Sequence, residues 1–298
     1  MSDPAASPEQ PAVARRRLRL ALRGFRERRH ETQQQVADAL DWSLSKVIRI
    51  EGGEVTVSRS DVGALLEHYG VRDAKIVQPL LTDARTARRK GWWTEPHFRD
   101  HLTPATQQLV QFESVATAIR CFQPTVVPGP LQTPRYAEAI FNYWSGQLDE
   151  PTRVVRVESR TRRYAQIFER QHPAKYLLIL DESVILREIG GPEVAAEQLS
   201  FLLDQQAAGR VQIRVLPLTD PAAGALIGPF TVMDLEQESA LIYREAWLGD
   251  EIVQTFDEVA RHRRHFDRMW DDSFGESVSR DLLVARSSAV IASLGRSR

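Results

Sequence analysis

Two helix start signals within residues 32–53 constrain the fold of this chain more than any other feature. Thr32 is a predicted N-cap, because its hydroxyl can accept the backbone N–H of Gln35 while the Gln35 side chain reaches back to the backbone of Thr32. Ser43 is a second predicted N-cap, and the glycines at positions 52–53 mark a helix end. The segment is therefore predicted to form two short helices joined by a tight turn.

Apolar side chains recur at helical spacing along both of these helices. The small residue Ala37 permits the helices to cross closely, and Asp41 in the turn tolerates a left-handed backbone better than most residues do. The predicted inward face consists of Val36, Ala37, Leu40, Val47 and Ile50. The opposite face of the second helix is then left exposed.

Three further helices are predicted beside this pair, over about residues 15–29, from Ser58 onward and over about residues 73–90. With them, residues 15–90 form an all-α module of five helices. Prolines among small and polar residues predict a disordered arm over residues 1–14.

The charge of the chain is divided unevenly between its two parts. Residues 15–90 hold 17 Lys and Arg against 10 Asp and Glu, whereas residues 91–298 hold 22 against 28. A basic module on an acidic body favours a polyanionic partner, although many basic segments are only solvated surfaces.

The rest of the chain mixes helical and strand patterns. Apolar runs at residues 175–180 and 211–216 flank a helical pattern at 192–208, which predicts a strand–helix–strand unit. Further strands are predicted at 229–235 and 239–245, and further helices at 104–122, 134–145, 151–171 and 250–271. The predicted fold class is thus multidomain, all-α followed by one α+β domain over residues 91–283, with a tail over 284–298.

The helix pair resembles the helix-turn-helix of XRE-type, phage repressor-like regulators, over about residues 15–75. The residues at the characteristic places are Gln33, Leu40, Ser43, Ser45, Arg49, Ile50, Glu51 and Gly52. Asp41 replaces the glycine that is usual in the turn, and Leu44 replaces a polar residue at a base-reading position. The resemblance implies DNA binding, with the second helix in the major groove.

Three residues at the start and on the outward face of the second helix are expected to meet base edges. Ser45 and Arg49 lie one turn apart, and Arg49 can pair with both O6 and N7 of guanine. Leu44 offers no hydrogen bond there but can contact a thymine methyl group.

Other residues of the pair are expected to meet phosphates. Gln33 lies at the start of the first helix, where its side chain and backbone N–H can hold a phosphate. Lys46 is expected to contact the DNA backbone, and Ser43 is either a cap alone or a cap with a phosphate contact. The alternative for the whole segment is a helical hairpin whose charges are merely solvated.

The second part of the chain carries a further resemblance. The segments ESVATAIRCFQPTVVPGP, LQTPRYAEAI, LDESVILREIGGPEV, VQIRVLP and GPFTVMDLE follow one another between about residues 92 and 283. They resemble the large C-terminal domain of many actinobacterial XRE-type regulators, sometimes described as toxin–antitoxin-like, with Pro130 in place of an expected leucine. The resemblance implies transcriptional regulation, often together with a small protein encoded nearby, and a partner-binding or ligand-sensing role for this domain.

Two sets of residues in this domain are candidates for a ligand or partner surface. The proline-rich stretch at 124–136 presents Gln132, Thr133 and Arg135, or else it packs helices together. Asp181 and Glu182 follow an apolar strand, where α/β ligand sites often lie. Their alternative role is to cap the next turn or to pair with Arg187.

Catalytic and metal-binding patterns are weak. His97 and His101 are four residues apart but lack the glutamate of a helical zinc motif, and no P-loop, Rossmann fingerprint or nucleophile elbow occurs. Cys121 lies in an apolar pattern and is expected to be a buried thiol. We expect no enzymatic activity, no cofactor and no metal.

The expected partners follow from these points. One reading helix spans only a few base pairs, so a homodimer on a pseudo-palindromic operator is expected. The alternatives are an antitoxin-like module that mainly masks a small partner protein, and a regulator that senses a small-molecule effector. No apolar run approaches the roughly 18 residues of a membrane span, and residues 1–10 lack a secretory pattern, so a cytoplasmic location without membrane contact is expected.

Overall fold

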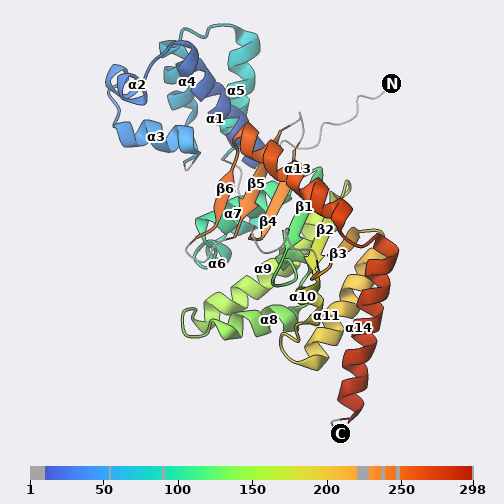
Figure 1. Cartoon of the computed structure of the whole chain (residues 1–298). Coiled ribbons are helices and arrows are strands. Elements are labelled where there is room, and N and C mark those ends of the chain that lie inside the picture. Colours follow the sequence, from blue (N-terminus) through green and yellow to red (C-terminus); the bar gives the residue numbers. More distant parts are fainter. Residues whose placement is uncertain are drawn as a thin grey trace, which may run out of the picture. The chain divides into compact units, whose positions relative to one another are not determined.

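The computed structural model describes residues 11–53, 55–88, 91–219, 228–235, 239–245 and 249–296. The chain forms two compact units, Met1–Trp92 and Trp93–Arg298. The first unit is helical, and the second combines helices with a six-stranded mixed sheet (Figure 1). This arrangement confirms the predicted fold class.

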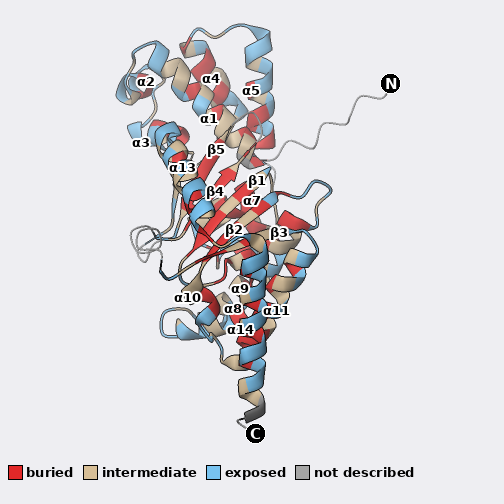
Figure 2. Ribbon diagram, turned by 45° about the vertical axis from the view of Figure 1, so that its right-hand side comes forward, coloured by how far each residue is buried: buried red, intermediate tan, exposed pale blue. Residues whose placement is uncertain are grey.

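The first unit is built from five helices, as predicted. They are α1 (Pro11–Arg28), α2 (Gln33–Ala39), α3 (Leu44–Gly52), α4 (Arg59–His68) and α5 (Ala74–Thr86). One apolar core joins all five, with side chains such as Leu18 of α1, Ala37 of α2 and Val62 of α4 at its centre. Figure 2 shows buried residues along the faces that these helices turn toward each other.

The predicted arm over residues 1–14 is wrong at its C-terminal end, because α1 begins at Pro11. Proline fits the first turn of a helix, since its φ is already helical and its missing N–H is not needed there. Ala14 is only 1% exposed, so burial of its side chain favours this turn. Residues 1–10 lie outside the described residues.

The sheet of the second unit has the order β3-β2-β1-β4-β5-β6. Its strands are β1 (Ala118–Gln123), β2 (Lys175–Asp181), β3 (Val211–Leu216), β4 (Phe230–Asp234), β5 (Ala240–Arg244) and β6 (Glu251–Val253). The first three run parallel, and β4, β5 and β6 are joined antiparallel to their neighbours. The predicted strand–helix–strand unit is confirmed, since β2 and β3 are parallel neighbours in the sheet.

Helices pack on both faces of this sheet. The short helices described after the first five are η1 (Trp92–Thr94), α6 (Pro96–Arg99), η2 (Gly129–Leu131) and α10 (Glu182–Leu186). The longer ones are α7 (Pro104–Glu113), α8 (Pro134–Tyr143), α9 (Glu150–Phe168), α11 (Pro192–Ala207), α13 (Phe256–Asp272) and α14 (Glu276–Arg296). α13 covers one face, where Phe266 shares a core with Phe122 and Phe230. α9 packs on the opposite face, where the ring of Phe168 lies 5.3 Å from that of Tyr176.

Three predicted elements differ in the structure. The helix expected over 104–122 ends at Glu113, and β1 follows, because pairing with β2 and β4 on both sides outweighs the helical spacing of its apolar residues. The helix expected over 250–271 is split into β6 and α13. The expected tail over 284–298 is helical through residue 296, because Val290 is buried against α11.

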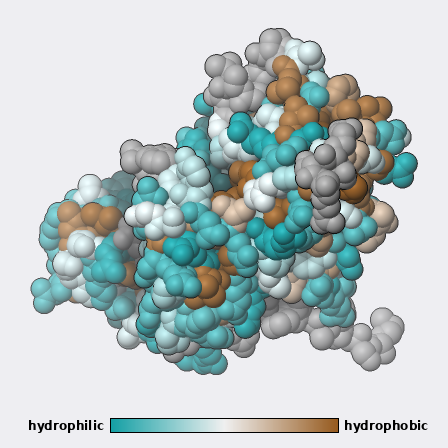
Figure 3. All heavy atoms as spheres, turned by 90° about the horizontal axis from the view of Figure 1, so that it is seen from below, coloured by the Kyte–Doolittle hydropathy of each residue, from teal (hydrophilic) through white to brown (hydrophobic). Residues whose placement is uncertain are grey.

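On the face drawn in Figure 3 most of the surface is hydrophilic and the hydrophobic residues form separate groups. Within the described part of the chain, no helix combines the length and apolar character that crossing a membrane requires.

Cys121 is buried in β1, 1% exposed, and its Sγ accepts a hydrogen bond from Thr231 Oγ1 at 3.5 Å. Burial raises the pKa of the Cys121 thiol to about 12, so the reactive thiolate is scarce at pH 8. We expect Cys121 to resist a thiol reagent such as dithiobisnitrobenzoate at pH 8 in the native protein, and to react fully in guanidinium chloride. Stoichiometric labelling of the native chain within minutes would contradict this burial.

Candidate nucleic-acid interface

The helix pair α2–α3 begins and ends through local hydrogen bonds. The Thr32 hydroxyl accepts the Gln35 N–H at 3.2 Å, and the Gln35 side chain accepts the Thr32 N–H at 2.8 Å, so the predicted capping box is confirmed. The Ser43 hydroxyl caps α3 by accepting the Lys46 N–H at 3.2 Å. α3 ends at the predicted glycines, where Gly53 has a φ of 76°.

The turn between the helices uses a left-handed residue. Asp41 has a φ of 55°, a region that favours glycine and that Asp and Asn reach more easily than other residues. The prediction that Asp41 takes over the role of the usual glycine is therefore confirmed. The Trp42 N–H then donates to the Ala37 carbonyl at 2.8 Å, which closes the turn.

Packing of α3 on the core decides which side chains face outward. Val47 and Ile50 are 2% and 3% exposed and join the same core as Val36 and Ala37 of α2. The exposed positions of α3 are Leu44, Ser45, Ile48, Arg49 and Gly52, whose spacing places them on one side of the helix. The structure thus brings three predicted base-reading residues, Leu44, Ser45 and Arg49, onto one exposed surface.

Ile48 belongs to this surface although the sequence reasoning did not single it out. Its side chain is 43% exposed, and Leu44, one turn earlier, is 37% exposed. These two apolar side chains remain on the outward face of α3 although burial of such side chains is favourable. The spacing of four between Leu44 and Ile48, out of phase with Val47 and Ile50, was the signal in the sequence.

Lys46 is held by neighbours within the unit. Its Nζ donates to Asp61 Oδ1 at 2.8 Å and lies 3.6 Å from the centre of the Trp42 ring. Against the burial of the Asp61 carboxylate, the hydrogen bonds from Lys46 and Ser58 hold its pKa below the usual value. The phosphate contact expected of Lys46 stays a prediction, and this contact would compete with Asp61.

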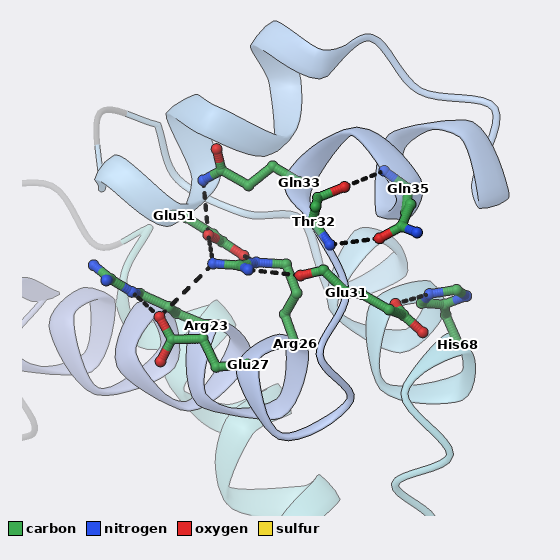
Figure 4. A network of polar contacts seen from close by, with 9 residues as sticks. All are labelled: Arg23, Arg26, Glu27, Glu31, Thr32, Gln33, Gln35, Glu51 and His68. Atoms are coloured by element: carbon green, nitrogen blue, oxygen red, sulfur yellow. Dashed lines mark hydrogen bonds and ion pairs between the residues drawn. The ribbon is translucent and has the colours of Figure 1, made fainter.

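A buried polar network ties α3 to α1 and α2 (Figure 4). Glu51 of α3 accepts hydrogen bonds from Arg26 Nε at 2.7 Å and Nη2 at 2.9 Å, and from Gln33 Nε2 at 2.8 Å. The side chains of Glu51 and Arg26 are 5% and 13% exposed. The hydrogen bonds to Glu51 hold the pKa of Arg26 above its ordinary value.

This network changes the interpretation of Gln33. The Gln33 side-chain amide donates to Glu51, so this side chain helps to position α3. Of the two groups expected to hold a phosphate, only the backbone N–H groups at the start of α2 remain for that contact. Arg26 was not predicted as a site residue. Its separation of 25 residues from Glu51 gave no local pattern to recognise.

Two of the residues proposed as a ligand surface in the second unit are internal. Gln132 is 8% exposed and Thr133 is 5% exposed, so the prediction that they form a recognition surface is wrong. Gln132 Nε2 donates to the Val127 carbonyl at 2.6 Å, while Thr133 is the N-cap of α8, which makes these residues parts of the loop packing. Arg135 is exposed and pairs with Glu197 at 3.1 Å.

The acidic pair at the carboxyl end of β2 also has structural partners. Asp181 caps α10 by accepting the Ser183 N–H at 2.9 Å, which was the alternative role considered. Glu182 Oε2 accepts the Leu218 N–H at 3.0 Å, and Arg187 is exposed. Among the described residues these three form no ion pair with each other.

The histidines considered as metal ligands contact different partners. His97 Nε2 lies 2.8 Å from Glu158 Oε2, and His101 Nδ1 lies 2.8 Å from the Thr152 hydroxyl. Within the described ranges, no group of three or more His, Cys, Asp or Glu side chains is arranged to hold a metal ion.

Comparison with known families matches both units. A helix-turn-helix domain matches residues 17–76, which include α2, α3 and α4 and most of α1. No curated protein and no solved structure matches the chain. A domain of unknown function (DUF5753) matches residues 106–284. Because that match spans more than half of the sequence, the protein belongs to the DUF5753 family, and it carries a helix-turn-helix domain in front of the family's defining domain.

Proposed function

We propose that this protein is a non-enzymatic, cytoplasmic DNA-binding transcriptional regulator of the XRE type, which reads the major groove with α3. The observation that carries the proposal is the outward face of α3, where Leu44, Ser45, Ile48 and Arg49 are exposed while Val47 and Ile50 anchor the helix in the core. The match of residues 17–76 to a helix-turn-helix domain supports it.

Each part of this face suits a different feature of DNA. Arg49 can donate two hydrogen bonds to guanine, and Ser45 can donate to or accept from a base edge. Leu44 and Ile48 present hydrocarbon suited to thymine methyl groups. The free N–H groups at the start of α2, together with Ser43, suit phosphate contacts that set the position of the helix without reading sequence.

The proposal includes a homodimer. One α3 covers only a few base pairs, and two related by a twofold axis would read half-sites about 34 Å apart on one side of the duplex. The DUF5753 unit is proposed to regulate this reading by binding a partner protein or an effector.

The Arg49→Ala variant tests the reading face. We expect it to lose about 1–3 kcal/mol of specific binding energy and to tolerate substitutions at one base pair of each half-site. The matched control is Arg72→Ala, which removes an equal charge from an exposed position outside the helix pair. Fluorescence anisotropy with the operator and single-base variants measures both. If the two variants behaved alike, the assigned reading face would be wrong.

Selection of bound sequences from a randomised duplex library at physiological salt tests the function as a whole. We expect enrichment of an inverted repeat with half-sites about one helical turn apart. If no sequence is enriched and binding disappears as salt rises, the unit has only a non-specific basic surface. That outcome would favour a protein partner as the main target of the chain.

A further inference from the structure

An unsatisfied polar group lies at the carboxyl end of β1. Gln123, the last residue of this strand, is 3% exposed. Its Oε1 is buried and has no hydrogen-bond partner among the described residues. A buried acceptor without a partner is destabilising, so such atoms in native proteins call for an explanation.

Gln123 faces the side of the sheet that α9 covers. Side chains alternate along a strand, so Gln123 points to the same side as Cys121. Cys121 is paired with Thr231 of β4, and Thr231 with Tyr243 of β5, which places Tyr243 on that side too. The carboxyl ends of the parallel strands β1 and β2 border this region, and ligands of α/β sheets bind at such ends.

Arg160 and Arg163 of α9 both interact electrostatically with Tyr243 on this side of the sheet, and they differ in how they are neutralised. Arg163 forms a two-pronged ion pair with Glu113 of α7, with N–O distances of 2.8 and 2.7 Å. Arg160 has no ion-pair partner within 4.0 Å among the described residues. Its Nε donates to the neutral Gln132 Oε1 at 2.6 Å, and its guanidinium lies 4.3 Å from the centre of the Phe141 ring.

The surroundings of Arg160 leave its charge poorly compensated. Burial lowers the pKa of Arg160 to about 9, and the positive charges of Arg163 and Arg156 act in the same direction. Attraction by Glu245 opposes them only in part. Arg160 is therefore a protonated guanidinium at neutral pH that an added anion would stabilise.

We infer that the region between α9 and the carboxyl end of β1 binds a small anionic molecule, whose carboxylate or phosphate pairs with Arg160 and whose hydrogen-bond donor meets Gln123 Oε1. Gln132 and Phe141 hold the guanidinium in place for this contact. The inference concerns the second unit alone and does not depend on DNA binding by the first.

Paired probes separate the two contacts. Inorganic phosphate carries a P–OH donor at neutral pH, whereas sulfate has none; glycolate and acetate differ in the same way among carboxylates. We expect phosphate or glycolate to raise the Tm of the full chain by about 3–6 °C at ten times its Kd, and the donor-free partner of each pair to bind more weakly. The pair of probes that raises the Tm shows whether the anionic group of the bound molecule is a phosphate or a carboxylate.

Variants distinguish a site from a general salt effect. Arg160→Met is expected to weaken binding of the active probe at least tenfold by calorimetry, whereas the control Arg162→Met, which changes an exposed arginine of the same helix, keeps it. Gln123→Met leaves Arg160 unchanged. We expect it to abolish the preference for the probe that carries a hydrogen-bond donor. Equal Tm shifts in wild type and Arg160→Met, or no response to any probe at 100 mM, would overturn the inference.

The same variants keep this inference separate from the proposed function. Operator binding by Arg160→Met is measured alongside calorimetry. Loss of anion binding with DNA binding intact supports the site in the second unit, and absence of DNA binding in the wild type bears on the first unit alone.

Discussion

The Glu51→Ala variant is expected to lose most of the order of α3. It leaves Arg26 buried without its carboxylate and removes the acceptor of Gln33, and breaking a buried ion pair in this way costs about 3–5 kcal/mol. Because the network joins α3 to α1 and α2, the loss falls on the reading helix itself. We expect specific DNA binding to fall with it.

Hydrogen exchange followed by mass spectrometry localises this effect. Amide protection in peptides covering α3 is expected to fall by about two orders of magnitude or more, while β2 and β3 keep theirs. The control is Glu27→Ala, which removes an exposed carboxylate that is hydrogen-bonded to the 58% exposed Arg23 and lies 3.9 Å from Arg26, so we expect only a small effect. If Glu51→Ala and Glu27→Ala gave equal protection, the buried network would not position α3.

The Glu113→Ala variant is expected to have an effect of similar size in the second unit. The Glu113 and Arg163 side chains are 6% and 10% exposed, so removal of the carboxylate strands a buried guanidinium at a cost of about 3–5 kcal/mol. Glu113 ends α7 and Arg163 lies in the middle of α9, so the pair joins the two helices over the sheet. Urea unfolding of the full chain measures the change.

A double variant separates the charge from the packing. Glu113→Leu with Arg163→Met removes both charges, and we expect it to be less destabilised than either single variant, because no buried charge is left unpaired. The control Glu158→Ala changes an exposed carboxylate on α9. A double variant as unstable as the sum of both singles would show that the ion pair is not the source of the stability.

Patterns of short range in the sequence predicted local structure well. The capping box at Thr32, the cap at Ser43 and the left-handed Asp41 each depend on atoms a few residues apart, so the sequence contains their full physical cause. The parallel pair β2–β3 was also predictable. Two strands joined by a helix are usually parallel neighbours in one sheet.

Patterns that depend on distant neighbours were predicted poorly. β1 was expected to be helical because its apolar residues have a helical spacing, but it is the strand that joins the parallel and antiparallel parts of the sheet. Gln132 and Thr133 were expected on the surface because they are polar, whereas hydrogen bonds from Arg160 and to Gln198 satisfy them inside. Burial of a polar group depends on partners that the sequence does not place.

The sequence by itself therefore determined the helix pair, its turn and the outward position of Ser45 and Arg49, because helix periodicity and capping act over one or two turns. Only the tertiary structure decided that Arg26 and Gln33 hold Glu51, and that Arg160 lies over the sheet without a carboxylate partner within the described residues. The residues in these contacts are 18 to 28 positions apart in the sequence and belong to different elements. Only the folded core brings them together.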